Sequence, residues 1–174
     1  MKKNVSAKDL TYIALCTALL CVCSWISIPT VVPFTLQTFA VFASLLLLGP
    51  WKGCAAIALY LALGAIGLPV FSGFSGGVSA LLGPTGGYLA GFLLTAPVYA
   101  LIARERTWTK VAALAAGLLV CYAFGTFWFV KTYTGGMTFL RALELCVIPF
   151  LIPDALKLAL AVIVAPRISR AVRL

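Results

Sequence analysis

Long apolar runs without a charged side chain constrain this chain more than any other feature. Residues 10–28 and 111–130 are 19 and 20 residues long and contain no Asp, Glu, Lys or Arg. A helix needs about 20 apolar residues to cross the hydrocarbon core of a bilayer. Because 63% of the 174 residues are hydrophobic and only 10% are charged, a water-soluble domain is excluded. We expect an all-α integral membrane protein, with residues 1–174 forming a single transmembrane domain.

Glycine and proline residues divide the chain into six apolar segments, which predict a bundle of six transmembrane helices. Residues 35–48 and 54–67 are short for a full crossing, so these helices are expected to be tilted or to start below the membrane surface. The run 10–28 has no small-residue cleavage site and is expected to be retained. The expected helices cover about 10–28, 35–48, 54–67, 84–103, 111–130 and 153 onward to the basic tail at Arg167, with a short additional helix at 138–146 that carries Arg141 and Glu144 as a surface pair.

The loop at 68–83, which follows the third expected helix, is apolar, glycine-rich and uncharged. Irregular backbone at membrane depth is tolerated only where it is buried in protein or lines a cavity. We therefore expect a re-entrant outer loop that covers a pocket, with Phe71 and Phe74 as apolar walls. A mobile external loop is the alternative, and the hydrophobicity of the segment argues against it.

Basic residues cluster at the ends of alternate segments, which is the positive-inside pattern. This distribution predicts a multi-pass protein of the bacterial cytoplasmic membrane with both termini in the cytoplasm. The net charge of +9 is then explained by topology and by contact with the lipid bilayer, so no nucleic acid partner is expected. The ten residues on the predicted cytoplasmic side are Lys2, Lys3, Lys8, Lys52, Arg104, Arg106, Lys110, Arg167, Arg170 and Arg173.

Asp154 and Lys157 place an acid and a base inside the apolar run that starts at 148. A spacing of three puts both on one face of a helix, about one turn apart. Pro153 suits the first turn of a helix, so Asp154 is expected at the helix N-terminus. A charge at membrane depth is costly and usually marks a functional site. The alternative is that the two groups pair only to hold the helix in the bundle.

Polar and aromatic side chains near the expected outer ends of the helices are further candidates for ligand contact. Gln37 follows two prolines and would contact a ligand or bond a neighbouring helix. Gly86 and Gly87 permit close approach by a ligand or by another helix. Tyr122 and Trp128 belong to an aromatic cluster that would stack on a ligand or form part of the interfacial aromatic belt.

The chain lacks the combinations of side chains that common catalytic sites need, so no enzyme is expected. Histidine is absent, which excludes Ser-His and Cys-His dyads. The four carboxylates form no pair for hydrolysis, and the six cysteines show no metal-binding spacing. There is no phosphate loop for ATP. A cavity that binds a small amphipathic solute, without cofactor or metal, is the remaining interpretation.

Four stretches in order carry a resemblance to a known family: VPFTLQT (32–38), GAIGLPVF (64–71), GPTGGY (83–88) and IPDALK (152–157). Together they resemble BioY, the biotin-binding S component of energy-coupling factor (ECF) transporters. The resemblance implies six helices, high-affinity biotin binding near the outer face, and a partner module of one transmembrane T component and two ATPases. It also implies that Ala14 and Ala18, a small-xxx-small pair, contact the T component.

The resemblance implies that Asp154 accepts hydrogen bonds from the ureido N–H groups of biotin. For Lys157 it leaves three roles open: contact with the ureido oxygen, contact with the biotin carboxylate, or pairing with Asp154 only. The residues expected at the ligand are Thr35, Gln37, Phe71, Ser75, Gly86, Gly87, Tyr88, Tyr122, Trp128, Asp154 and Lys157. The alternatives are an S component for another small vitamin, a membrane-embedded enzyme and a structural assembly subunit.

Overall fold

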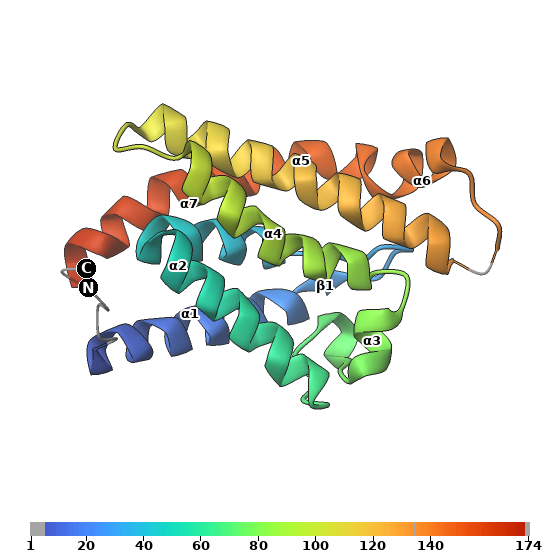
Figure 1. The fold of residues 1–174 in the computed structure, drawn as a ribbon, viewed down its shortest axis with the longest axis horizontal. Coiled ribbons are helices and arrows are strands. Elements are labelled where there is room, and N and C mark those ends of the chain that lie inside the picture. Colours follow the sequence, from blue (N-terminus) through green and yellow to red (C-terminus); the bar gives the residue numbers. More distant parts are fainter. Residues whose placement is uncertain (1–5, 134, 173–174) are drawn as a thin grey trace.

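A computed structural model describes residues 6–133 and 135–172 and is almost entirely helical (Figure 1). Two strands of two residues each, β1 (Ser27–Ile28) and β2 (Phe34–Thr35), pair antiparallel. The prediction of an all-α membrane protein is confirmed. The helices are α1 (Ala7–Trp25), α2 (Gln37–Ala65), the 3-10 turn η1 (Ser72–Phe74), α3 (Val78–Leu82), α4 (Gly86–Ile102), α5 (Thr107–Thr132), α6 (Phe139–Cys146) and α7 (Ile148–Val172).

Helix α2 reverses direction at Gly49, whose φ of 75° is not helical. Pro50 follows directly, and proline is well tolerated at the first position of a helix. The two arms, 37–48 and 50–65, pack side by side, because Gln37 donates a hydrogen bond to Tyr60 and a Cβ at Gly53 would lie 2.9 Å from Leu45. The turn is therefore one residue long, shorter than the five residues predicted.

Among the predicted helix ends that are wrong, two have a clear local cause. The first helix ends at Trp25, not at residue 28, because Ser27–Ile28 pairs with β2. The last helix begins at Ile148, five residues before Pro153, because Pro149 already lies in its first turn, where a missing N–H costs little. Asp154 therefore lies inside α7 and not at its N-terminus, so its charge has to be stabilised by other groups.

The loop at 66–85 is fastened to α1. The indole of Trp25 donates to the carbonyl of Pro69 (2.8 Å), and the hydroxyl of Ser24 donates to the carbonyl of Val70. The ring of Phe71 is buried against Tyr60 of α2. Phe74 is 66% exposed, stacks on Trp25 and does not line the pocket, so the prediction that it walls a pocket is wrong. The loop contains η1 and α3; its re-entrant character and the six crossings stay predictions.

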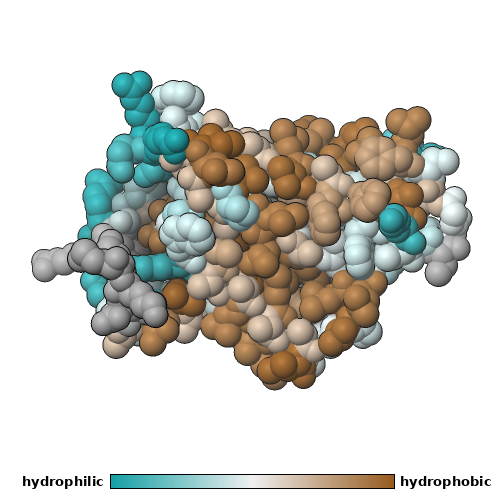
Figure 2. All heavy atoms as spheres, viewed as in Figure 1, coloured by the Kyte–Doolittle hydropathy of each residue, from teal (hydrophilic) through white to brown (hydrophobic). Residues whose placement is uncertain are grey.

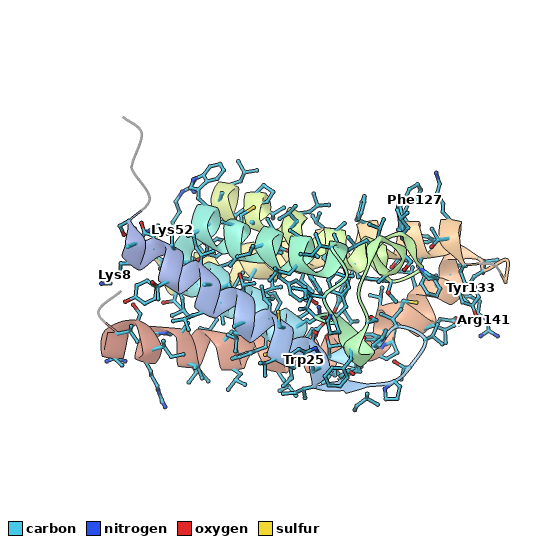
Figure 3. All side chains as sticks on the ribbon, turned by 90° about the horizontal axis from the view of Figure 1, so that it is seen from below. Lys8, Trp25, Lys52, Phe127, Tyr133 and Arg141 are labelled. Atoms are coloured by element: carbon cyan, nitrogen blue, oxygen red, sulfur yellow. The ribbon has the colours of Figure 1, made fainter. Side chains whose placement is uncertain are left out.

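The surface is that of a multi-pass membrane protein. Helices α1, α2, α5 and α7 are long and apolar enough to cross a bilayer, and α4 is a shorter apolar helix. Figure 2 shows an apolar band over the middle of the molecule and hydrophilic residues at the end where α1 begins and α7 ends. Lys8 and Lys52 lie at that end, and Arg141 lies at the opposite end (Figure 3). Lys2, Lys3 and Arg173 are outside the described residues.

Helices α4 and α5 approach closely through glycines. A Cβ at Gly87 would lie 2.3 Å from the Cβ of Trp128, and one at Gly125 would lie 2.2 Å from the ring of Tyr88. Either side chain would therefore push the helices apart. Gly87 was considered for close approach by a ligand or by another helix, and in the structure it packs against α5. The packing of Gly125 against the ring of Tyr88 fixes the position of Tyr88.

Candidate functional site

A pocket lies between the helices and the 66–85 loop. About 730 Å³ of empty space lies inside it, a volume that includes open solvent at its mouth. Helices α2, α4, α5, α6 and α7 all contribute to its wall. The lining residues are Val32, Pro33, Thr35, Gln37, Thr38, Phe71, Ser72, Ser75, Ala80, Thr85, Tyr88, Leu89, Phe92, Leu118, Cys121, Tyr122, Cys146, Phe150, Asp154 and Lys157.

The carboxylate of Asp154 is held by three donors from three helices. Thr38 of α2 donates to Oδ1 (2.8 Å), Tyr122 of α5 donates to Oδ2 (2.5 Å), and Lys157 of α7 approaches Oδ1 at 2.7 Å. Asp154 is only 1% exposed. Charged hydrogen bonds of this kind offset the cost of removing a carboxylate from water. Side chains therefore supply the stabilisation that the helix N-terminus was predicted to supply.

Lys157 lies beside Asp154 because a spacing of three brings both side chains to one face of α7. Its ammonium also lies 4.9 Å from the centre of the Phe34 ring, in a cation–π contact. Phe34 in turn stacks on Phe150, with ring centres 4.6 Å apart. The ion pair and Phe150 thus line one side of the pocket, and Phe34 packs against both Lys157 and Phe150.

The unused lone pair of Asp154 and the unused N–H groups of Lys157 define which polar groups of a ligand can bind here. A carboxylate accepts about four hydrogen bonds and an ammonium donates three. Within the described part of the chain, Asp154 accepts three, and Lys157 directs one N–H to Asp154. The pair therefore retains both an acceptor and donors, side by side, for a polar group that carries both functions.

Neutral polar groups line the rest of the pocket. Thr35 donates to Gln37 (3.1 Å), whose amide donates to Tyr60. The hydroxyls of Tyr88 and Thr126 share a hydrogen bond of 3.0 Å. These contacts hold Gln37 and Tyr88 in fixed orientations, which favours a pocket that is formed before the ligand arrives.

The structure brings most of the predicted ligand contacts together. Eight of the eleven line the pocket: Thr35, Gln37, Phe71, Ser75, Tyr88, Tyr122, Asp154 and Lys157.

Gly86, Gly87 and Trp128 do not line the pocket. Gly86 packs against the backbone of Leu81, and Gly87 packs against Trp128. The indole of Trp128 donates to the carbonyl of Gly83 (3.0 Å), so this ring anchors the end of the 66–85 loop. Thr85 occupies the N-cap position of α4 but makes no capping hydrogen bond with its side chain.

Sequence reasoning missed Thr38 and Phe34. Both lie in the stretch 32–38, where only Thr35 and Gln37 were selected. Thr38 lies three residues after Thr35, and a hydroxyl in a largely apolar segment was the available signal. Nothing local to Phe34 indicates that it faces Lys157, because the two residues are 123 positions apart (157 − 34).

Comparisons with known proteins agree with one another. The model of the BioY family matches residues 1–174. The biotin transporter BioY of Thermotoga maritima is 44% identical over 158 residues, covering 88% of this chain and 91% of that protein. A probable biotin transporter BioY of Pyrococcus horikoshii is 42% identical over 167 residues, covering 95% and 98%.

The fold is also similar to a solved structure. The S-component for biotin from an ECF-type ABC transporter superimposes with a TM-score of 0.84 at 27% sequence identity. The match covers 98% of this chain and 95% of that one. The likeness therefore extends over the helices and the 66–85 loop that together form the pocket.

Proposed function

The chain belongs to the BioY family, and on that premise we propose that it binds biotin and mediates its uptake as the S component of an ECF transporter. The observation that carries the proposal is the buried Asp154–Lys157 pair in a preformed pocket. Biotin has a ureido ring with two N–H groups beside a carbonyl, followed by an apolar ring and chain. A carboxylate beside an ammonium, with aromatic walls, is complementary to that combination.

Asp154 is proposed to accept a hydrogen bond from a ureido N–H group. Tyr122, Tyr88, Gln37, Thr35 and Ser75 are proposed to add polar contacts, and Phe71 to add an apolar wall. This assignment is supported by their common position around one pocket. Gly86, Gly87 and Trp128 are assigned to helix and loop packing instead.

The proposed partners are a T component and two ATPases. Ala14 and Ala18 lie on the exposed face of α1, one turn apart, with Leu15 also exposed at 60%. Small residues at this spacing allow another helix to approach closely in a membrane. This exposed face supports α1 as the contact with the T component.

We propose a single domain in the bacterial cytoplasmic membrane, with both termini in the cytoplasm and the pocket opening outward. The described basic residues Lys8 and Lys52 lie at the end where α1 begins, which supports this orientation. Tyr12 of α1 bonds the backbone of Val172, so the last described turn of α7 lies at the same end.

Biotin binding by the full chain, purified in detergent, tests the proposal. We expect tight binding by the wild type and a loss of more than about 100-fold in Asp154→Asn and Lys157→Ala, because buried charged hydrogen bonds contribute several kcal/mol. Glu144→Gln is the matched control, since it makes the same acid-to-amide change at an exposed pair. Wild-type protein that is folded but does not bind biotin would refute the proposal. Binding of another vitamin in place of biotin would identify the chain as an S component for that vitamin.

A further inference from the structure

We infer that a groove on the surface binds the phosphate headgroup of an anionic phospholipid. The groove lies between the turn of α2 at Gly49 and the connection from α4 to α5, residues 103–106. Figure 1 places both segments at the end of the molecule where α1 begins and α7 ends. No described residue lines both this groove and the pocket around Asp154, so the inference does not depend on the proposed function.

The first argument is the charge of the groove. Arg104, Arg106 and Lys110 line it together with one acid, Glu105, which leaves a net charge of +2 (3 − 1). In the part of the chain that the structure describes, none of these three cations makes an ion pair with a carboxylate. Basic pockets between transmembrane helices bind anionic lipid headgroups, and phosphate oxygens accept strong hydrogen bonds from Arg and Lys.

The second argument is a hydroxyl that is available in the groove. Tyr99 of α4 lines the groove and is only 4% exposed. Across the described residues its hydroxyl has no hydrogen-bond partner, yet no polar side-chain atom there is both unpartnered and sealed from solvent. The hydroxyl therefore faces the open space of the groove. A phosphate oxygen accepts from such a donor and satisfies a group whose removal from water is otherwise unfavourable.

The third argument is that the basic connection is held in a fixed shape. Thr109, buried in the first turn of α5, accepts from the N–H of Arg104 (3.0 Å) and donates to the carbonyl of Arg106 (2.7 Å). The guanidinium of Arg104 donates through Nη1 to two backbone carbonyls at the end of α4, which leaves its other N–H groups for a ligand. Helix α5 has no acid in its first turn, so its dipole adds positive potential here.

The apolar part of the groove indicates a lipid and not a soluble anion. Leu46, Pro50 and Ala103 line the groove beside the cations. Trp108 also lines it and is 64% exposed, and tryptophan is enriched where hydrocarbon meets water. An acyl chain would lie against these side chains, whereas a free phosphate ion would gain nothing from them.

The test compares two lipids on the full chain. Protein purified in detergent receives equal amounts of dioleoylphosphatidylglycerol and dioleoylphosphatidylcholine, and native mass spectrometry measures how much of each is retained. Both lipids carry a phosphate and the same acyl chains, but only phosphatidylglycerol has a net negative charge. We expect phosphatidylglycerol to bind about tenfold more tightly. Equal retention of the two lipids would overturn the inference.

A double variant assigns the lipid to the groove. Arg106→Gln combined with Lys110→Gln should weaken phosphatidylglycerol binding by about 30-fold, since each cation contributes about a factor of five. Lys131→Gln combined with Arg141→Gln is the matched control, because it removes two cations that do not line the groove. Equal losses in the two double variants would show that net charge alone holds the lipid, and would refute the site.

Two single variants test the groove without removing a cation. Glu105→Gln removes the one acid among the described lining residues and should strengthen phosphatidylglycerol binding by about threefold, because it relieves repulsion of the phosphate. Tyr99→Phe removes only the hydroxyl and should weaken binding by about threefold. Circular dichroism checks that both variants keep their helices. Unchanged binding in both folded variants would contradict the inference even if the double variant failed to fold.

Inorganic phosphate distinguishes a lipid from a soluble ligand. At an ionic strength matched with sodium chloride, millimolar phosphate should not displace phosphatidylglycerol. Displacement by phosphate, where chloride has no effect, would assign the groove to a soluble phosphate and overturn the lipid assignment.

Discussion

Two ion pairs of the same spacing lie close in sequence and differ in almost everything else. Asp154 and Lys157 of α7 and Arg141 and Glu144 of α6 are both i,i+3 pairs. The side chains of Asp154 and Lys157 are 2% and 9% exposed, and those of Arg141 and Glu144 are 73% and 57% exposed. The buried pair is joined by Thr38 and Tyr122 from two other helices. The exposed pair is bridged by a single contact of 3.3 Å.

The comparison teaches that spacing predicts the contact but not its consequence. In water, an exposed pair gains little because solvent screens the charges and the side chains lose rotational freedom. In a desolvated pocket, the same pair is unfavourable unless further hydrogen bonds satisfy it. Thr38 and Tyr122 meet that requirement, and in doing so they tie α2, α5 and α7 to one carboxylate.

The largest expected effect comes from removing one charge of the buried pair. Lys157→Met leaves Asp154 without its cation and should lower the free energy of unfolding by about 3–5 kcal/mol. Reversible unfolding in mixed detergent micelles measures this, with Arg141→Met as the matched change in the exposed pair. Equal stability of the two variants would show that the burial of Asp154 has no energetic consequence.

The next effect should come from the donors that only the buried pair has. Tyr122→Phe removes a hydroxyl from Oδ2 of Asp154 with little change in volume, and should cost about 1–3 kcal/mol of stability. Tyr133→Phe, at the more exposed end of α5, is the control and should be neutral. The same unfolding assay applies; a neutral Tyr122→Phe would mean that the carboxylate does not depend on α5.

Replacing both charges separates stability from binding. Asp154→Leu combined with Lys157→Met should bring stability back to within about 1 kcal/mol of the wild type, because an apolar pair avoids the desolvation cost. Biotin binding should be abolished. A double variant as unstable as Lys157→Met alone would contradict the idea that the pair is kept for binding.

The smallest effect is expected at the exposed pair. Glu144→Gln should change the free energy of unfolding by less than about 0.5 kcal/mol and leave biotin affinity unchanged. High salt should change the free energy of unfolding of the wild type by no more than the Glu144→Gln substitution does. A loss above 1 kcal/mol would show that α6 depends on the pair more than its exposure implies.

The sequence predicted the parts of the fold and site that local pattern governs. Apolar runs located the helices, and a charge pair in an apolar run located Asp154 and Lys157. Tyr122 was selected as an aromatic candidate, but its hydrogen bond to Asp154 spans 32 positions and no local signal encodes it. Thr38 bonds the same carboxylate across 116 positions.

The helix start at Ile148 was missed because Pro149 and Pro153 both read as the first turn of a helix. Trp128 was misplaced because the face that an aromatic ring presents in a bundle depends on how the neighbouring helices pack. Here Gly87 leaves room for that ring between α4 and α5. Tertiary packing, which no local pattern encodes, decided the second case.

The attachment of the 66–85 loop to α1 has a mechanical consequence. At the end of the 19-residue helix α1, Ser24 donates a hydrogen bond to Val70 and Trp25 donates one to Pro69. Phe74 stacks on Trp25. Ala14 and Ala18 lie on the exposed face of that same helix. A helix is stiff over this length, so a torque applied at the alanines is transmitted to the segment that covers the pocket. A rotation of α1 would therefore move the 66–85 loop with it.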